Sequence, residues 1–220
     1  MMAAPTTKIS ALAAVLLCAT AFLAADAASS PKANKADDPV AKACANVTSQ
    51  NHSRYGGPGL TIEFCKSALG SEKRSAAARH PRDLALVAMD LVRSGAADAG
   101  AKVDGALRSA KRSKDTALTL RYCRQDYEAV VHTVSVCHGM VQEYDPAAAG
   151  RGHHSGDLLP YTYLECTDKQ MNAAHYCWTH IFYDEEVKKA VWKEVEEISS
   201  RANLAKAMVE QMLGIVDDDD

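Results

Sequence analysis

The sequence lacks the short motifs that mark most enzyme active sites. It has no G-x-S-x-G turn, no Gly-rich phosphate loop, no H-E-x-x-H helix and no C-x-x-C pair, so it carries no signature of a serine hydrolase, a P-loop protein, a zinc protease or a dithiol oxidoreductase. It also has no basic block and no basic stripe interleaved with aromatic residues, which argues against nucleic acid as a partner. These absences predict a protein that binds rather than catalyses, with no catalytic residue, metal or cofactor.

The histidines do not have the spacing of a metal site on a helix. His132 and His138 are six residues apart, and His175 and His180 are five apart, whereas ligands on one helix face are three or four apart. Four aromatic residues are interpreted as core or groove residues rather than as cofactor contacts: Tyr122, Tyr127, Trp178 and Trp192.

Only the N-terminus has a long apolar run. Lys8 precedes the run from Ala11 to Ala25, which is too short to span a bilayer comfortably and is followed by Ala25-Asp26-Ala27. We therefore predict a secretory signal peptide over residues 1–27, with a retained anchor as the weaker alternative, and a flexible leader over 28–38. The exported chain is expected to be extracellular.

The cysteines fit that compartment. The sequence has seven, and Cys18 leaves with the signal peptide, so an even number enters an oxidising route. All six are predicted to form disulfides: Cys44, Cys65, Cys123, Cys137, Cys166 and Cys177. The formal net charge of the chain is −3, and the four aspartates Asp217–Asp220 contribute four of its negative charges. Residues 216–220 are therefore expected to be a solvated acidic tail.

Two short helical segments precede the main body of the chain. Pro39–Val47 and Leu60–Leu69 flank the turn sequence Gly56-Gly57-Pro58-Gly59, which predicts a helical hairpin over 39–70. A bridge between Cys44 and Cys65 would close this hairpin, because neither segment is long enough to hold a helix unaided. Pairing of one of them with a later cysteine is the alternative. Asn46 and Asn51 begin N-glycosylation sequons, which indicate surface positions in a secreted chain.

Four long amphipathic segments follow, and no strand pattern or internal repeat is present. They cover residues 81–111, 116–141, 158–183 and 185–215. The second is the most regular, since its apolar positions alternate steps of four and three: Thr116, Leu120, Cys123, Tyr127, Val130, Val134, Cys137 and Val141. Short connections between such segments predict an all-α, up-and-down four-helix bundle over 81–215.

Residue numbers favour one pairing of the four bundle cysteines. Facing residues of an antiparallel helix pair have a constant sum, and Cys123 with Cys177 sums to 300 while Cys137 with Cys166 sums to 303. The crossed pairs differ by 25 in their sums, or about 37 Å at 1.5 Å per residue, which straight helices cannot bridge. Nested pairing is therefore predicted, and the outer bridge would stabilise the fold by about 4 kcal/mol.

Four stretches of the chain share a pattern with known proteins. The most specific is the run Tyr122-Cys123-Arg124-Gln125-Asp126-Tyr127-Glu128-Ala129-Val130, and the others are Cys44 with Thr48, Asn172-Ala173-Ala174 before Cys177 with Phe182 after it, and Asn203–Val209. These stretches resemble the plant invertase and pectin methylesterase inhibitor family. The likeness extends over about residues 40–215. Cys137 and Cys166 are extra to the family pattern, and the spacing from Cys123 to Cys166 is nearer to the family spacing, which leaves Cys166 as an alternative partner for Cys123.

The resemblance implies an inhibitor domain over 39–215 that caps the carbohydrate-binding cleft of a secreted enzyme without covalent chemistry, in the apoplast or cell wall. It names pectin methylesterase as the first target and acid invertase, of the cell wall or the vacuole, as the second. The Pro-Lys-Phe motif linked to invertase binding is absent, which weighs against invertase. A secreted helical structural or signalling protein without inhibitory activity is a further alternative.

Overall fold

The helices of the protein are seen in a computed structural model that describes residues 38–50, 60–109, 113–145 and 159–215. Within these residues every regular element is helical, which confirms the all-α prediction. The elements are α1 (Pro39–Gln50), α2 (Ile62–Gly70), the 3-10 helix η1 (Ser75–Ala77), α3 (Pro81–Leu107), α4 (Lys114–Gln142), α6 (Pro160–Ile181) and α7 (Glu185–Met212).

The signal peptide, the leader, the glycine turn at 56–59, Asn51 and the acidic tail lie outside the described residues, so the predictions made for them stay predictions. Three long helices are slightly shorter than predicted, since α3 ends at Leu107, α6 covers Pro160–Ile181 and α7 ends at Met212, whereas α4 extends slightly beyond the predicted 116–141.

The starts of α3, α4 and α7 are each set by a side chain that binds free backbone N–H groups, whereas α6 begins at Pro160 without a side-chain cap. The Ser113 hydroxyl accepts from the Thr116 N–H at 3.0 Å, and the Asp184 carboxylate accepts from the N–H groups of Glu186 and Val187. At α3, Pro81 occupies the first turn and Asp83 reaches back to the Arg79 and His80 N–H groups. These contacts satisfy donors that a helix leaves unpaired at its N-terminus.

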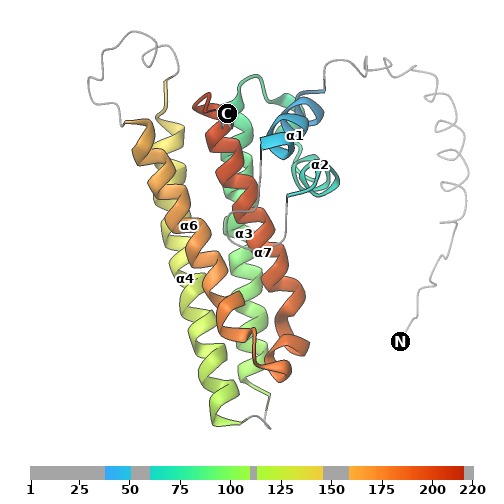
Figure 1. The fold of residues 1–220 in the computed structure, drawn as a ribbon, viewed down its shortest axis with the longest axis vertical. Coiled ribbons are helices and arrows are strands. Elements are labelled where there is room, and N and C mark those ends of the chain that lie inside the picture. The colour runs from blue at the N-terminus through green and yellow to red at the C-terminus, as the bar shows by residue number, and fades with distance from the viewer. Residues whose placement is uncertain (1–37, 51–59, 110–112, 146–158, 216–220) are drawn as a thin grey trace, which may run out of the picture. The chain divides into compact units, whose positions relative to one another are not determined.

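The four long helices form the predicted bundle. Contacts join α3 to α4, α4 to α6, α6 to α7 and α7 back to α3, so each helix packs against two neighbours (Figure 1). The hairpin of α1 and α2 is placed against this ring, with α1 on α7 and α2 on α3. It therefore belongs to the same hydrophobic core as the bundle.

Burial on α4 follows the predicted seam residue for residue: its buried set is Thr116, Leu120, Cys123, Tyr127, Val130, Val134, Cys137 and Val141. On α7 the buried face is wider than one helical seam, since Leu204, Ala207 and Met208 are buried beside regularly spaced residues such as Val187, Val191 and Val195. Helix α7 packs on α1 in addition to α3 and α6. On α6 the buried residues include Thr167, Met171 and Ala174 as well as Cys177, while Cys166 is only partly buried.

Three disulfides cross-link the described residues. Cys44–Cys65 joins α1 to α2 with a Cα–Cα distance of 5.7 Å. Cys123–Cys177 and Cys137–Cys166 both join α4 to α6, with Cα–Cα distances of 4.5 and 5.7 Å. The two bundle bridges are thus nested, and the three-residue difference in register is accommodated within ordinary disulfide spacing.

Two glycines of α3 provide a paired test of its packing. A Cβ at Gly105 would meet nothing within 4 Å, whereas at Gly95 it would lie 2.9 Å from Arg201 Nη1. That guanidinium is already held by a 3.0 Å bond to the Leu91 carbonyl.

We expect Gly105→Ala to raise the free energy of unfolding by about 1 kcal/mol, because alanine is the better helix former. Gly95→Ala should be at least about 1 kcal/mol less stable than Gly105→Ala, because Arg201 must move. Urea unfolding of both variants measures the difference, and equal stabilities would contradict the packing described here.

Candidate interaction surface

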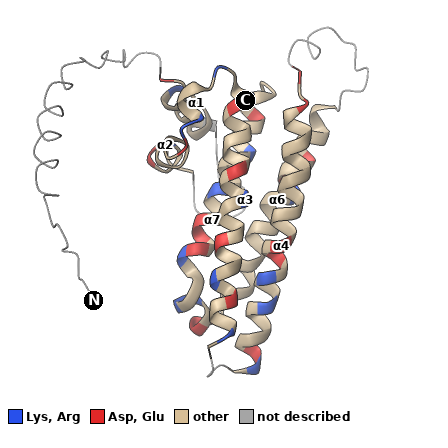
Figure 2. Ribbon diagram, turned by 180° about the vertical axis from the view of Figure 1, so that it is seen from behind, with Lys and Arg blue, Asp and Glu red and all other residues tan. Residues whose placement is uncertain are grey.

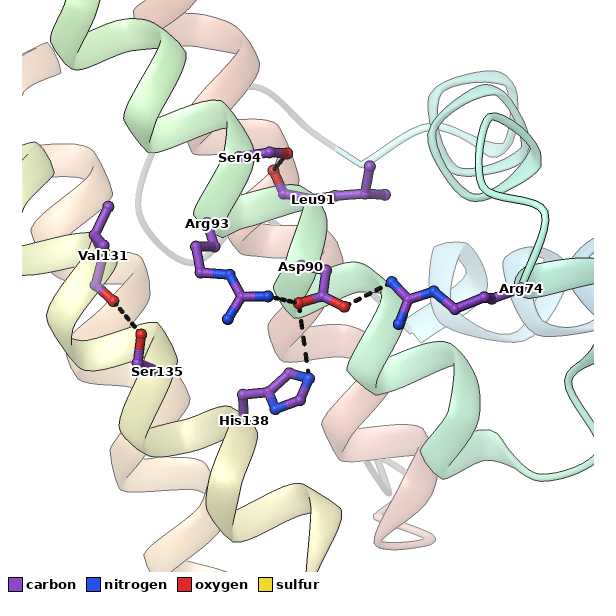
Figure 3. Close-up of polar contacts among 8 residues, drawn as sticks. All are labelled: Arg74, Asp90, Leu91, Arg93, Ser94, Val131, Ser135 and His138. Carbon is purple, nitrogen blue, oxygen red and sulfur yellow. Dashed lines mark hydrogen bonds and ion pairs between the residues drawn. The ribbon is translucent and has the colours of Figure 1, made fainter.

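Asp90 is the centre of the largest ion-pair group on α3. Its Oδ2 is 2.6 Å from Arg74 Nη2, its Oδ1 is bonded to Arg93 Nη2, and His138 Nε2 lies 3.7 Å from the same Oδ1 (Figure 3). The Asp90 side chain is only 17% exposed. These contacts connect the segment before η1 to α3 and α4, so they fix the N-terminal hairpin segment to the bundle.

The serines beside this group are not arranged for catalysis. The Ser94 hydroxyl donates to the Leu91 carbonyl at 3.2 Å, and the Ser135 hydroxyl donates to the Val131 carbonyl at 2.8 Å (Figure 3). Each hydroxyl is therefore turned back onto its own helix rather than toward His138. A nucleophile needs a base within hydrogen-bond reach, and these contacts do not provide one.

A second carboxylate lies between α4 and α6. Asp126 Oδ2 is buried without a hydrogen-bond partner, and His180 Nε2 lies 3.4 Å from it. Burial raises the pKa of Asp126 to about 6, and His180 lowers it in part. The neighbouring Tyr127 hydroxyl is also buried and unpaired, and its pKa is raised by burial and by the negative charges of Asp126 and Glu194. These groups affect the stability of the bundle rather than its outer surface.

The described residues contain no group of three or more His, Cys, Asp or Glu side chains that could hold a metal ion. Acidic and basic residues are interspersed along the long helices, and within the described residues they form no single block of one sign (Figure 2). In the part of the chain that the structure describes, no helix is both long and apolar enough to cross a membrane.

Aromatic side chains gather where α6 turns into α7. Trp178 is stacked on His175 at 4.9 Å between ring centroids, and it also contacts Phe182 at 5.0 Å and Trp192 at 6.1 Å. Tyr183 meets Phe182 edge-on at 4.9 Å. We refer to these five residues as the aromatic cluster.

The outer members of the aromatic cluster face solvent. Tyr183 is 91% exposed and Phe182 is 40% exposed, while Trp178 and Trp192 are partly buried beneath them. Lys188 lies over the Phe182 ring at 4.9 Å and is paired with Glu185 at 2.8 Å. The cluster is therefore pre-organised by its own contacts before any partner arrives.

A second aromatic pair borders this end of the bundle. The Tyr122 ring of α4 packs against His180 of α6 at 5.3 Å, and Tyr122 and Tyr176 are each about half exposed. Large exposed rings on rigid helices are typical of protein interfaces, because they bury much apolar area at little cost in side-chain entropy. This surface can bind a partner, and it holds no chemistry of its own.

The groove between α3 and α4 is the other candidate. It has a volume of about 410 Å³ and a floor of small residues that includes Ala97, Gly100 and Ala101. Its rim is occupied by Arg124, which lies 3.4 Å from Asp104 and 3.1 Å from Glu128. Because Arg124 is already paired with both carboxylates, it is a weak recognition group for a partner.

The sequence located only part of the aromatic surface. Of the four aromatic residues interpreted as core or groove, Tyr127 is buried in the core, Trp178 and Trp192 are partly buried, and Tyr122 is exposed. The sequence alone did not indicate a functional role for Phe182 or Tyr183. A signal was present, because residues 175, 178 and 182 follow helical spacing just before the turn that reverses the chain.

Comparison with known proteins gives one result that covers nearly all of this fold. The family model for plant invertase/pectin methylesterase inhibitors matches residues 38–213, which run from the start of α1 to just beyond α7. A search of curated protein sequences gave no match.

Proposed function

Because the chain belongs to the plant invertase/pectin methylesterase inhibitor family, we propose that it inhibits pectin methylesterase by capping the active-site cleft of that enzyme without forming a covalent bond. The observation that carries the proposal is the family match over residues 38–213, which includes every helix of the bundle and the hairpin. Members of this family are inhibitors rather than enzymes, so no residue of the chain need perform chemistry.

The architecture suits a cap that works by shape. Two disulfides fasten α4 to α6 and a third closes the hairpin, so the surface presented to an enzyme is largely rigid before binding. Rigid surfaces lose little conformational entropy on association, and this raises affinity. We place the contact with the enzyme at the aromatic cluster, because its exposed rings are the residue types that dominate interface energies.

A pair of tyrosine substitutions tests that placement. Tyr183 and Tyr161 are both exposed, at 91% and 69%; Tyr161 lies in the first turn of α6, and Tyr183 lies in the turn just after this helix ends. Tyr183→Ala should weaken binding to the target enzyme by about tenfold or more, as expected for loss of an interface anchor worth at least about 1.4 kcal/mol. Tyr161→Ala should bind as the wild type does. Surface plasmon resonance with immobilised enzyme measures the dissociation constant of each variant. An equal loss of affinity in the two variants, or no loss in either, would place the contact elsewhere.

Acid invertase is the second candidate, since the family description names both enzymes. Parallel inhibition assays of a pectin methylesterase and an acid invertase, each with the purified oxidised protein from acidic to neutral pH, decide between them. The protein is proposed to act outside the cell, in the apoplast or cell wall, as its predicted signal peptide implies. Recovery of the mature chain in the extracellular fluid, beginning near residue 28, tests this.

A secreted structural or signalling role without inhibition remains the further alternative, and it predicts that neither enzyme is affected. Turnover of a sugar ester by the protein alone would instead show an enzyme.

A further inference from the structure

The sequon Asn46-Val47-Thr48 lies within helix α1 rather than in a loop. The Asn46 side chain is exposed, whereas Val47 is buried at 2% exposure in the core. The Thr48 hydroxyl donates to the Cys44 carbonyl, one turn back, at 2.8 Å. Sequons in secreted proteins are expected on surface loops, so this location requires an explanation.

A helical sequon is a poor acceptor for a glycan. Residues two apart on an α-helix are turned by about 200° from each other, so their side chains do not face the same side. Glycosylation of Asn-x-Thr needs the asparagine amide and the threonine hydroxyl to be recognised together by one enzyme site. In folded α1 the two groups point apart, and the hydroxyl is occupied by the Cys44 carbonyl.

Helix α1 cannot be stable while the chain is being made. It has 12 residues, a length at which an isolated helix is marginal in water. Outside the helix itself, its supports are the Cys44–Cys65 disulfide and packing on α2, η1 and α7. Because α7 spans Glu185–Met212, it is synthesised long after Asn46 has entered the exporting compartment.

We propose that Asn46 is N-glycosylated on the nascent chain and that this reaction competes with closure of the Cys44–Cys65 disulfide. In the reaction an oligosaccharide is transferred from a polyprenyl diphosphate carrier to the Asn46 side chain. A bond forms between the sugar C1 and Asn46 Nδ2, the bond between C1 and the diphosphate oxygen breaks, and the amide nitrogen loses one proton as the diphosphate leaves. Once the disulfide has closed and α1 has docked on α7, the sequon is no longer an acceptor.

The glycan would not obstruct the surface proposed for enzyme binding. Helix α1 packs beside the C-terminal half of α7, where Leu204 and Met208 are buried, whereas the aromatic cluster lies at the N-terminal end of α7 (Figure 1). The inference goes beyond the proposed inhibition and requires only export of the chain. Asn46→Gln should accordingly leave inhibition unchanged.

Occupancy of the site in exported protein is the first arm of the test. The chain is expressed through a eukaryotic secretory pathway, and total cellular and secreted protein is deglycosylated enzymatically in ¹⁸O-labelled water. Trypsin then releases one peptide, bounded by Lys42 and Arg54, that contains both Asn46 and Asn51, and fragment masses assign the label to each. We expect partial occupancy of Asn46 in the wild type and about twofold higher occupancy in Cys65→Ser, where the helix lacks its staple. Thr48→Ala is the matched control and should remove the label at Asn46 only.

The second arm does not depend on how Cys65→Ser folds. Full-length unglycosylated protein is given to purified oligosaccharyltransferase with its lipid-linked donor, either oxidised or after reduction of its disulfides. The reduced chain should be modified at Asn46 at least about tenfold faster than the oxidised chain, because only the former releases α1. Equal rates for the two forms, or an unlabelled Asn46 in every exported sample, would overturn the proposal.

Discussion

Replacing both Cys123 and Cys177 by alanine should lower the free energy of unfolding by about 4 kcal/mol. The bridge joins residues 54 positions apart, and on the chain-entropy model a loop of that size restricts the unfolded chain by about this amount. Both cysteines are fully buried, so alanine leaves an apolar site and adds no unpaired polar group. Urea unfolding under non-reducing conditions measures the loss.

The inner bridge is the matched control for this prediction. Cys137 and Cys166 are 29 residues apart, and their loop lies inside the one that the outer bridge closes. Alanine at both positions should therefore cost less than the outer pair does, by about 0.5 kcal/mol. An outer pair whose removal costs under about 1 kcal/mol would contradict the account. Peptide mapping without reduction should recover all three pairs, and free thiols at Cys137 and Cys166 would refute nested pairing.

Asp126→Asn should make the protein more stable at neutral pH. In the folded state burial raises the pKa of Asp126 from 3.8 to about 6, with a partial opposing effect of His180. The folded protein therefore holds this proton more tightly than the unfolded chain does. The stabilisation that comes from the protonated Asp126 side chain is complete below pH 3.8 and is lost as the pH rises through about 6. The side chain is 16% exposed, and allowing for that screening the loss amounts to about 2 kcal/mol.

Denaturant unfolding at a series of pH values tests this directly. The asparagine variant and the wild type should be nearly equal in stability at pH 4, and the variant should be more stable by about 2 kcal/mol at pH 7. Asp98, an exposed carboxylate on α3, is the control, since Asp98→Asn should change stability by less than about 0.5 kcal/mol at either pH. A wild type that gains stability relative to Asp126→Asn between pH 4 and pH 7 would show that the carboxylate is not held in a buried site.

The bundle could be predicted from the sequence because each long helix repeats one physical requirement. The regular spacing of Leu120, Tyr127 and Val134 on α4 indicates a single buried seam, and an antiparallel register follows from short connections. The two nested cysteine pairs found in the structure have nearly equal sums of residue numbers, as an antiparallel helix pair requires.

Burial that depends on contact with another helix could not be predicted from the periodicity of a single segment. Leu204 and Met208 are buried on α7, and α7 packs on α1 as well as on its two neighbours in the bundle. No periodicity in α7 indicates the contact with α1. Asp126 is similar, since its position in the α4 sequence resembles a solvated surface carboxylate, and its burial becomes evident only when α6 is in place.

The aromatic cluster was missed for a related reason. Trp178 and Trp192 lie on different helices and meet only because the chain reverses at residues 182–184. On each helix alone, such a residue has the spacing of a core position. Solvent exposure in the structure distinguishes a surface aromatic residue from a core one. The Tyr183 side chain, at 91% exposure, is the clearest surface residue of the cluster.

The most direct test of the account is the initial rate of pectin methylesterase measured against pectin concentration, at several concentrations of the purified oxidised protein. A non-covalent cap over the cleft excludes substrate, so the apparent KM should rise with inhibitor concentration while kcat stays constant, and activity should return on dilution. Full activity in the presence of excess protein, or a fall in kcat at constant KM, would contradict the account.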